Sequence, residues 1–294
     1  MDLQPYYKEN NVSNIHKTKR VKRMLRIILV ILTAYAALVI LAYFAQKKLL
    51  YFPDRSSLQI LISSSSHFGL ELWPAQDANY RGLMKSIPPK DYEGTVVVFH
   101  GNAGSARDRL YYINPLERLG YRVILAEYPG YGARDGRHGE TPFTVDALET
   151  VKIVRENFAG PLILWGESLG CGVVTGVVKH MGSKIEGVVL LTPWNSLTNL
   201  AQKLYRFLPV RLLIKDKYDN LTNLQGYRGP VAILMAGQDE IIPGSLTQHL
   251  YDSLKSPKKL WIFPHAGHNS WPTDPDESWW SEVKAFLEAP RTSD

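Results

Sequence analysis

The chain has 294 residues, enough for one α/β domain, and its 45% of hydrophobic residues is ordinary for a globular protein. Its formal charge of +6 does not indicate nucleic-acid binding, because residues 1–26 hold seven Lys/Arg and two Asp/Glu and so carry almost all of it. The rest of the chain is nearly neutral, so we expect no nucleic-acid partner. The single cysteine, Cys171, excludes an internal disulfide.

Residues 1–26 form a basic tail, which we expect to be disordered. Residues 27–45 contain no charged side chain, and as a helix they would span about 29 Å, close to the hydrocarbon thickness of a bilayer. A cleaved signal peptide is the alternative, but it has a shorter apolar region and small residues at its cleavage site, where this chain has Tyr43 and Phe44. We therefore expect one uncleaved transmembrane helix.

The basic residues before the apolar segment predict its orientation. By the positive-inside rule, the N-terminus lies in the cytoplasm and the domain that follows lies on the non-cytoplasmic face. That face is the periplasm if the protein is bacterial.

A single domain is expected over residues 49–288. We expect a polar loop at residues 63–66 and short antiparallel strands between residues 70 and 83. Strands then alternate with helices, which predicts an α/β fold with a mostly parallel, doubly wound sheet. The expected strands are residues 95–100, 122–126, 161–165, 185–191, 231–236 and 259–263; the expected helices are residues 109–119, 143–157, 171–178, 245–254 and 276–287.

Residues 194–228 are too many for a plain connection. Leu197, Leu200, Leu204 and Leu208 fall on one helical face within them. This face could pack on the core or cover a site, and we interpret the segment as a short helical lid insertion.

Gly166-Glu167-Ser168-Leu169-Gly170 follows an apolar strand and precedes a run of small apolar residues. A strand, a G-x-S-x-G turn and a helix together are typical of a nucleophile elbow. The five-residue pattern alone is weak, since a glycine-rich turn with an ordinary serine matches it equally well. Ser168 is therefore a candidate nucleophile that needs an acid and a base downstream.

Two further strand ends supply these partners. Asp239 follows the strand at residues 231–236 and is the candidate acid, with Glu240 as the alternative. His268 follows the last strand and is the candidate base in preference to His265, because Gly267 lets the chain turn back over the sheet.

An oxyanion hole needs two N–H donors. One is expected from Leu169, after the nucleophile, and the other from the loop after an early strand. Asn102 lies in that loop, with Ala103 as the alternative, and we expect His100 to hydrogen-bond within the loop.

With these features in order, the chain resembles the α/β-hydrolase superfamily, and within it the membrane-anchored serine hydrolases that include depalmitoylating thioesterases. The family often has Asp-Tyr-Arg-Gly where this chain has Glu127-Tyr128-Pro129-Gly130, which leaves the substrate preference open. The resemblance rests on His100-Gly101-Asn102-Ala103-Gly104, Tyr128-Pro129-Gly130-Tyr131-Gly132, Gly166-Glu167-Ser168-Leu169-Gly170, Thr192-Pro193-Trp194, Gly237-Gln238-Asp239 and Gly267-His268-Asn269.

The sequence thus predicts a membrane-anchored serine hydrolase that cleaves carboxylic esters or thioesters of a small-molecule or lipid-like acyl substrate. This chemistry requires no metal and no cofactor, and no clustered ligand spacing suggests one. An amidase or peptidase with the same triad, and an inactive membrane-tethered binding module, are the alternatives.

Overall fold

The structure is a computed structural model that describes residues 4–87 and 91–290, with side chains from Thr18 onward. The chain divides between Gln46 and Lys47 into two units, each described here by itself.

The first unit consists of most of helix α1 (Gln4–Leu50). The expectation that residues 1–26 are disordered is wrong for the described part of that segment, because the helix already begins at Gln4. Pro5 lies in the first turn, where its missing N–H has no helical partner to lose. No proline or glycine follows before Leu50, so no residue in the basic segment breaks the helix.

Apolar side chains cover every side of the middle of α1. The consecutive residues Leu29, Val30 and Ile31 point in different directions around the helix, yet each is 61–66% exposed within the chain. Among the described helices, one stretch, Thr18–Leu50, is long and apolar enough to cross a bilayer. A helix that is apolar all round suits a lipid environment rather than water.

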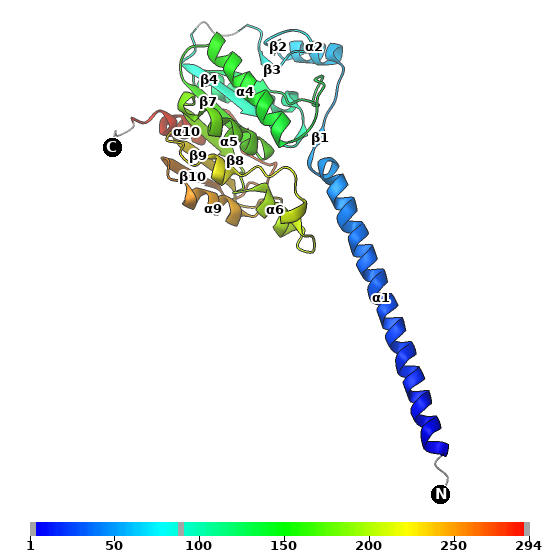
Figure 1. Ribbon diagram of the computed structural model, residues 1–294. Coiled ribbons are helices and arrows are strands. Elements are labelled where there is room, and N and C mark those ends of the chain that lie inside the picture. Colours follow the sequence, from blue (N-terminus) through cyan, green and yellow to red (C-terminus); the bar gives the residue numbers. More distant parts are fainter. Residues whose placement is uncertain (1–3, 88–90, 291–294) are drawn as a thin grey trace. The chain divides into compact units, whose positions relative to one another are not determined.

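The second unit contains an eight-stranded sheet in the order β10-β9-β8-β7-β4-β6-β3-β2 (Figure 1). Neighbouring strands from β10 to β6 pair in parallel, whereas β3 is antiparallel to both β2 and β6. The mostly parallel sheet and the short antiparallel strands at one edge are confirmed. The strands are β2 (Leu70–Trp73), β3 (Gly82–Lys85), β4 (Gly94–Phe99), β6 (Tyr121–Ala126), β7 (Leu162–Glu167), β8 (Gly187–Leu191), β9 (Val231–Ala236) and β10 (Lys258–Phe263).

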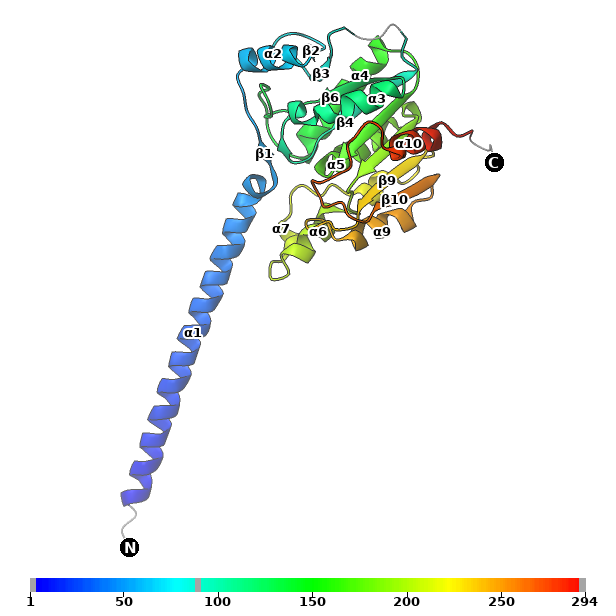
Figure 2. The ribbon, with the colours of Figure 1, turned by 180° about the vertical axis from the view of Figure 1, so that it is seen from behind.

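Helices cover both faces of this sheet. Figure 1 shows α4 (Glu140–Asn157) and α5 (Leu169–Met181) over one face, and α9 (Gly244–Ser253) packs on the same core. Figure 2 shows α3 (Ile113–Arg118) and α10 (Ser278–Glu288) over the other. Alternate residues of each strand enter the two cores, as with Val97 and Phe99 on one side and Val96 and Val98 on the other.

Local structure differs from expectation at two places. The serines at residues 63–66 belong to helix α2 (Leu58–His67), not to a loop. The Ser57 side chain caps this helix, and the Ser63 and Ser64 hydroxyls donate to carbonyls three residues earlier, which lets serine lie inside a helix. The helix expected at residues 109–119 is divided into η1 (Ala106–Tyr112) and α3.

The remaining elements are short. A two-stranded parallel pair joins β1 (Phe52–Pro53) to β5 (Ala103–Gly104), so the start of the second unit is fastened to the loop after β4. The 194–228 segment contains α6 (Leu197–Leu204), α7 (Val210–Leu213) and α8 (Asn220–Asn223), and η2 (Gly182–Lys184) follows α5.

Removal of residues 1–46 is expected to leave a soluble, folded and active domain. Among the residues that the structure describes, none before Leu50 contributes to the two cores of the second unit. Lys47 donates to the carbonyl of His138 at 2.6 Å, so the truncation should end before Lys47. Size-exclusion chromatography, thermal unfolding and ester hydrolysis of residues 47–294 test this. A folded but inactive domain would mean that α1 contributes to the site. A longer truncation that also removes residues 47–50 should lower Tm.

Candidate active site

The turn after β7 places Ser168 at the start of α5 in a strained conformation. Ser168 has φ 52° and ψ −111°, a left-handed φ that residues other than glycine seldom adopt. The flanking glycines allow the close approach that this turn requires. A Cβ on Gly166 would lie 2.6 Å from the backbone nitrogen of Cys171, and one on Gly170 would collide with the carbonyl oxygen of Phe99.

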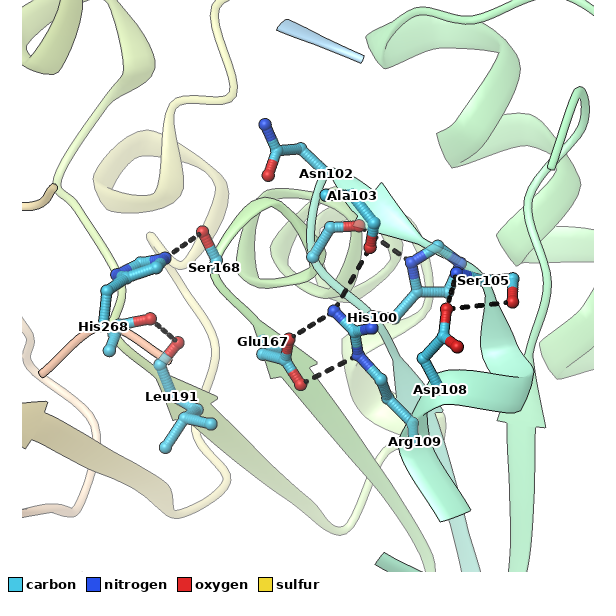
Figure 3. A network of polar contacts seen from close by, with 12 residues as sticks. His100, Asn102, Ala103, Ser105, Asp108, Arg109, Glu167, Ser168, Leu191 and His268 are labelled. Carbon is cyan, nitrogen blue, oxygen red and sulfur yellow. Dashed lines mark hydrogen bonds and ion pairs between the residues drawn. The ribbon is translucent and has the colours of Figure 1, made fainter. Parts of the chain in front are cut away.

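Three side chains from separate strand ends form a hydrogen-bonded chain, and Figure 3 shows its Ser168–His268 contact. Ser168 Oγ lies 3.1 Å from His268 Nε2, and His268 Nδ1 lies 2.9 Å from Asp239 Oδ2. Because a carboxylate only accepts, Nδ1 carries the hydrogen and Nε2 is free to accept the hydroxyl proton. The structure therefore brings together the three residues that the sequence suggested as nucleophile, base and acid.

The Asp239 carboxylate is held in its ionised form. Burial by itself raises the pKa of this group, but hydrogen bonds from His268 and from two backbone N–H groups outweigh burial and lower the pKa below its usual range. The two backbone donors are Ile241, at 2.9 Å from Oδ1, and Ile242, at 2.7 Å. An ionised carboxylate in this position fixes the tautomer and orientation of the imidazole.

The alternative acid and base lie elsewhere. Glu240 is exposed, and its Oε2 accepts from the backbone N–H of His268 at 3.0 Å rather than from the ring. His265 is exposed on the turn after β10. The side chain that approaches the Ser168 hydroxyl is that of His268, through Nε2.

Every carbonyl of the loop from His100 to Gly104 accepts a hydrogen bond. These contacts orient the peptide planes of this loop, which we refer to as the oxyanion loop, and so set the directions of its N–H groups. The donors are Tyr128 Oη to His100 O (2.8 Å), His100 Nδ1 to Gly101 O (2.8 Å), Phe52 N and Tyr131 Oη to Asn102 O (2.9 and 2.7 Å), Arg109 Nη2 to Ala103 O (3.3 Å) and Asp54 N to Gly104 O (2.8 Å).

The Asn102 side chain is engaged away from Ser168. Its Nδ2 donates to the carbonyl of Leu50 at 2.8 Å. Any contribution of Asn102 to an oxyanion hole must therefore come from its backbone N–H, as must that of Leu169.

Glu127 has a role that sequence reasoning missed. Its side chain is fully buried, with Oε1 at 3.0 Å from His100 Nε2 and Oε2 accepting from the backbone N–H of Ala106 at 3.2 Å. Glu127, where the chain departs from the family pattern, therefore contacts both His100 in the oxyanion loop and the backbone of Ala106 just after that loop. The sequence did show that Glu127 replaces the aspartate that is common in the family. It did not show that Glu127 contacts His100.

The four leucines of the 194–228 segment do not share one environment. Leu197 and Leu200 are buried in the core that also contains the side chains of α4 and α5, whereas Leu204 is 53% exposed. Helix α6 ends at Leu204, so Leu208 lies beyond it and does not extend the helical face. The core-packing interpretation therefore holds for the first two leucines, and serine at Leu200 would destabilise the domain.

Comparison with known proteins gives three kinds of similarity. Residues 90–221 match the family model described as serine aminopeptidase, S33. An uncharacterized protein of Mycobacterium tuberculosis (strain ATCC 25618 / H37Rv) is 27% identical over 238 residues, which cover 80% of this chain and 84% of that protein. The lysophosphatidylserine lipase ABHD12 of Danio rerio is 30% identical over 186 residues, 56% of this chain, and the match spans about half of the lipase, 48%.

Among solved structures, the ferulic-acid-bound Est1E of Butyrivibrio proteoclasticus superposes with a TM-score of 0.57 at 19% identity, covering 68% of this chain and 92% of that one. At this identity the likeness bears on the fold alone. It confirms the α/β-hydrolase fold that the sequence motifs suggested.

Proposed function

Because this chain belongs to the α/β-hydrolase superfamily and is a serine hydrolase, we propose that it cleaves carboxylic esters or thioesters of apolar acyl groups through an acyl-enzyme. The observation that carries the proposal is the hydrogen-bonded chain from Ser168 Oγ through His268 to Asp239. The similarity to a lysophosphatidylserine lipase supports an ester of lipid type as the substrate.

In this mechanism Ser168 Oγ attacks the acyl carbonyl while His268 Nε2 takes the hydroxyl proton. The tetrahedral intermediate collapses when His268 returns that proton to the leaving oxygen or sulfur. Water then attacks the acyl-enzyme by the same route and releases the acid. Asp239 remains ionised and stabilises the imidazolium that forms in each half-reaction.

The oxyanion hole is assigned to the backbone N–H groups of Asn102 and Leu169. Leu169 begins α5, so its N–H lies at the positive end of the helix dipole. The carbonyls on both sides of the Asn102 N–H, those of Gly101 and Asn102, are held by His100, Phe52 and Tyr131, which leaves the N–H little freedom. Removal of one such donor typically costs about 10²–10³ in rate.

An amidase or peptidase is the second candidate, favoured by the match to a serine aminopeptidase model. The same triad serves both reactions, so the substrate decides between them. Hydrolysis of p-nitrophenyl esters, acyl thioesters and aminoacyl anilides should be measured side by side with labelling by a fluorophosphonate probe. We expect labelling and a preference for esters or thioesters; an anilide preference would favour the peptidase, and a folded protein without labelling would favour a binding module.

We further propose that α1 is a single-pass membrane anchor with its N-terminus in the cytoplasm and the second unit on the non-cytoplasmic face. The apolar surface around Leu29–Ile31 and the basic residues before it support this orientation. The boundaries at residues 27–45 for the membrane span and 49–288 for the hydrolase domain belong to the same proposal.

Exposed apolar side chains lie at the end of α6 and just beyond it, where a leucine face over the site was expected. Leu204, Tyr205, Phe207 and Leu212, here called the apolar tip, are 53%, 48%, 89% and 86% exposed. Lys203, Arg206 and Arg211 alternate with them along the chain. Apolar side chains interleaved with basic ones suit the interface of a bilayer with anionic lipids.

The apolar tip belongs to a segment that is tied to the start of the second unit. Tyr51, the first residue after α1, donates its hydroxyl hydrogen to Asp216 Oδ2 at 2.8 Å, four residues beyond Leu212. If α1 is anchored in a bilayer, this contact keeps the tip's segment near the point where the chain leaves the anchor. We propose that the tip enters the bilayer and admits lipid-borne acyl substrates to the site.

Replacement of Phe207 and Leu212 together with serine is expected to lower the turnover of a monoacylglycerol presented in vesicles by about tenfold or more, because each buried side chain contributes about 1.5–3 kcal/mol to insertion. Turnover of soluble p-nitrophenyl acetate should not change. Val145→Ser, at an exposed position on α4, is the matched control. Equal losses on both substrates would contradict a membrane role for the tip.

A further inference from the structure

Two charged side chains that take no part in the hydrolytic steps form an ion pair next to the nucleophile turn. Glu167 is the residue before Ser168, and Arg109 comes from η1 on a separate part of the chain. Arg109 Nη2 lies 2.8 Å from Glu167 Oε1 and Nε lies 3.3 Å from Oε2, so the guanidinium and the carboxylate meet through two parallel contacts. Tyr111 and Tyr112 also donate to Glu167 Oε2, at 2.9 and 3.3 Å.

The same guanidinium contacts the oxyanion loop (Figure 3). Arg109 Nη2 donates to the carbonyl of Ala103 at 3.3 Å. A Cβ on Gly101 would lie only 3.3 Å from Glu167 Oε1, and one on Gly104 only 3.0 Å from Arg109 Nη1. The ion pair therefore packs against the loop on both sides of Asn102, the residue to which we assign an oxyanion donor.

Both groups are held in their charged forms. Burial raises the pKa of the Glu167 carboxyl, but the charge and hydrogen bonds of Arg109 outweigh it and lower the pKa below its usual range. Burial likewise lowers the pKa of Arg109, and Glu167 raises it above its ordinary value. Each side chain is 14% exposed. An ion pair this enclosed has a desolvation cost that offsets much of its attraction, so stability alone does not account for it.

We propose that Arg109 and Glu167 are positioning residues that hold the oxyanion loop at a set distance from Ser168. The two donors of the oxyanion hole belong to different segments: the Asn102 N–H follows β4, and the Leu169 N–H follows β7. The pair links these segments, since Glu167 is covalently next to Ser168 while Arg109 bonds both Glu167 and Ala103. It fixes the spacing of the two donors before the negative charge develops, which is where preorganisation lowers the barrier.

The inference rests on the proposed acyl-enzyme mechanism, and its test separates the two. Arg109→Gln, Arg109→Lys and Glu167→Gln are made in the full-length protein in detergent micelles. We expect Arg109→Gln to lower kcat for p-nitrophenyl butyrate by about 10–10²-fold with KM within about twofold, because a small displacement of a donor affects the transition state and not substrate binding. Its Ki for a trifluoromethyl ketone, which forms a tetrahedral adduct on the serine, should rise by the same factor.

Further variants distinguish positioning from folding. Arg109→Lys should recover part of kcat, since it keeps the charge but not the paired contacts. Arg109→Gln with Glu167→Gln should be no slower than Arg109→Gln alone, because the two residues act as one unit. Arg118→Gln, which removes an exposed ion pair with Asp276, should leave kcat and Ki unchanged.

Two results would overturn the inference. In the first, the Arg109 and Glu167 variants have a lower Tm but unchanged kcat and Ki. In the second, their kcat falls while Ki for the trifluoromethyl ketone does not change. If Arg109→Gln does not fold, Glu167→Gln and Arg109→Lys are measured for the same parallel change in kcat and Ki, and its absence overturns the inference. A wild-type protein that the fluorophosphonate probe does not label would instead overturn the proposed mechanism.

Discussion

Ser168→Ala should lower kcat for ester hydrolysis by about 10⁶-fold and abolish fluorophosphonate labelling, because it removes the oxygen that His268 Nε2 approaches at 3.1 Å. The fold should persist, since the replacement removes one polar atom and needs no new space. Hydrolysis of p-nitrophenyl butyrate and gel fluorescence of the labelled protein measure the two effects.

Ser63→Ala is the matched control, because Ser63 is an exposed serine on α2 whose hydroxyl donates only to a carbonyl of its own helix in the contacts described. It should keep full activity and labelling. Persistent labelling of the Ser168→Ala protein would show that another residue reacts with the probe and would remove Ser168 from the mechanism.

The second large effect is expected for Asp239→Asn, which should keep the fold and lower kcat by about 10⁴-fold. The asparagine amide can present N–H groups to His268 Nδ1, which favours the tautomer with its hydrogen on Nε2. That hydrogen would then point at Ser168 Oγ, and the imidazole could not accept the hydroxyl proton. Rates measured at several pH values above neutrality, with circular dichroism as the test of folding, check this.

Glu240→Gln provides the comparison within the same turn. Glu240 contacts the backbone N–H of His268 at 3.0 Å, and glutamine keeps a carbonyl oxygen that can accept this bond. We expect a loss of less than about tenfold, since the imidazole keeps its partner Asp239. The opposite order of effects would assign the acid to Glu240.

The sequence was most informative where function is local or follows from the order of elements. The apolar runs at β4, β6, β7, β8 and β9 predict strands covered on both faces, and short helical connections between them require a parallel sheet. Since the carboxyl ends of parallel strands share one edge, Ser168, Asp239 and His268 could be placed at that edge from their positions after three strands.

Residues that cooperate across long separations could not be found in this way. Arg109 and Glu167 are 58 positions apart, and His100 and Glu127 are 27 apart. The spacing of apolar residues indicates which face of a single helix or strand is buried. It gives no information on polar pairs that form between two elements. Both pairs depend on the distance between β4, β6, β7 and η1, which exists only once the sheet has assembled.

The positions at which helices begin and end could not be predicted from the sequence either. The spacing of Leu197, Leu200, Leu204 and Leu208 fits one helical face, but only the tertiary structure decided that α6 stops at Leu204, so that the first two leucines pack on the core and the chain beyond exposes Phe207 and Leu212. The composition of residues 27–45 by itself determined an apolar helix of membrane length, because length and the absence of charge are properties of the segment alone. The start of α1 at Gln4 was not determined by the segment's charge, since charged residues are compatible with a helix that no proline or glycine interrupts.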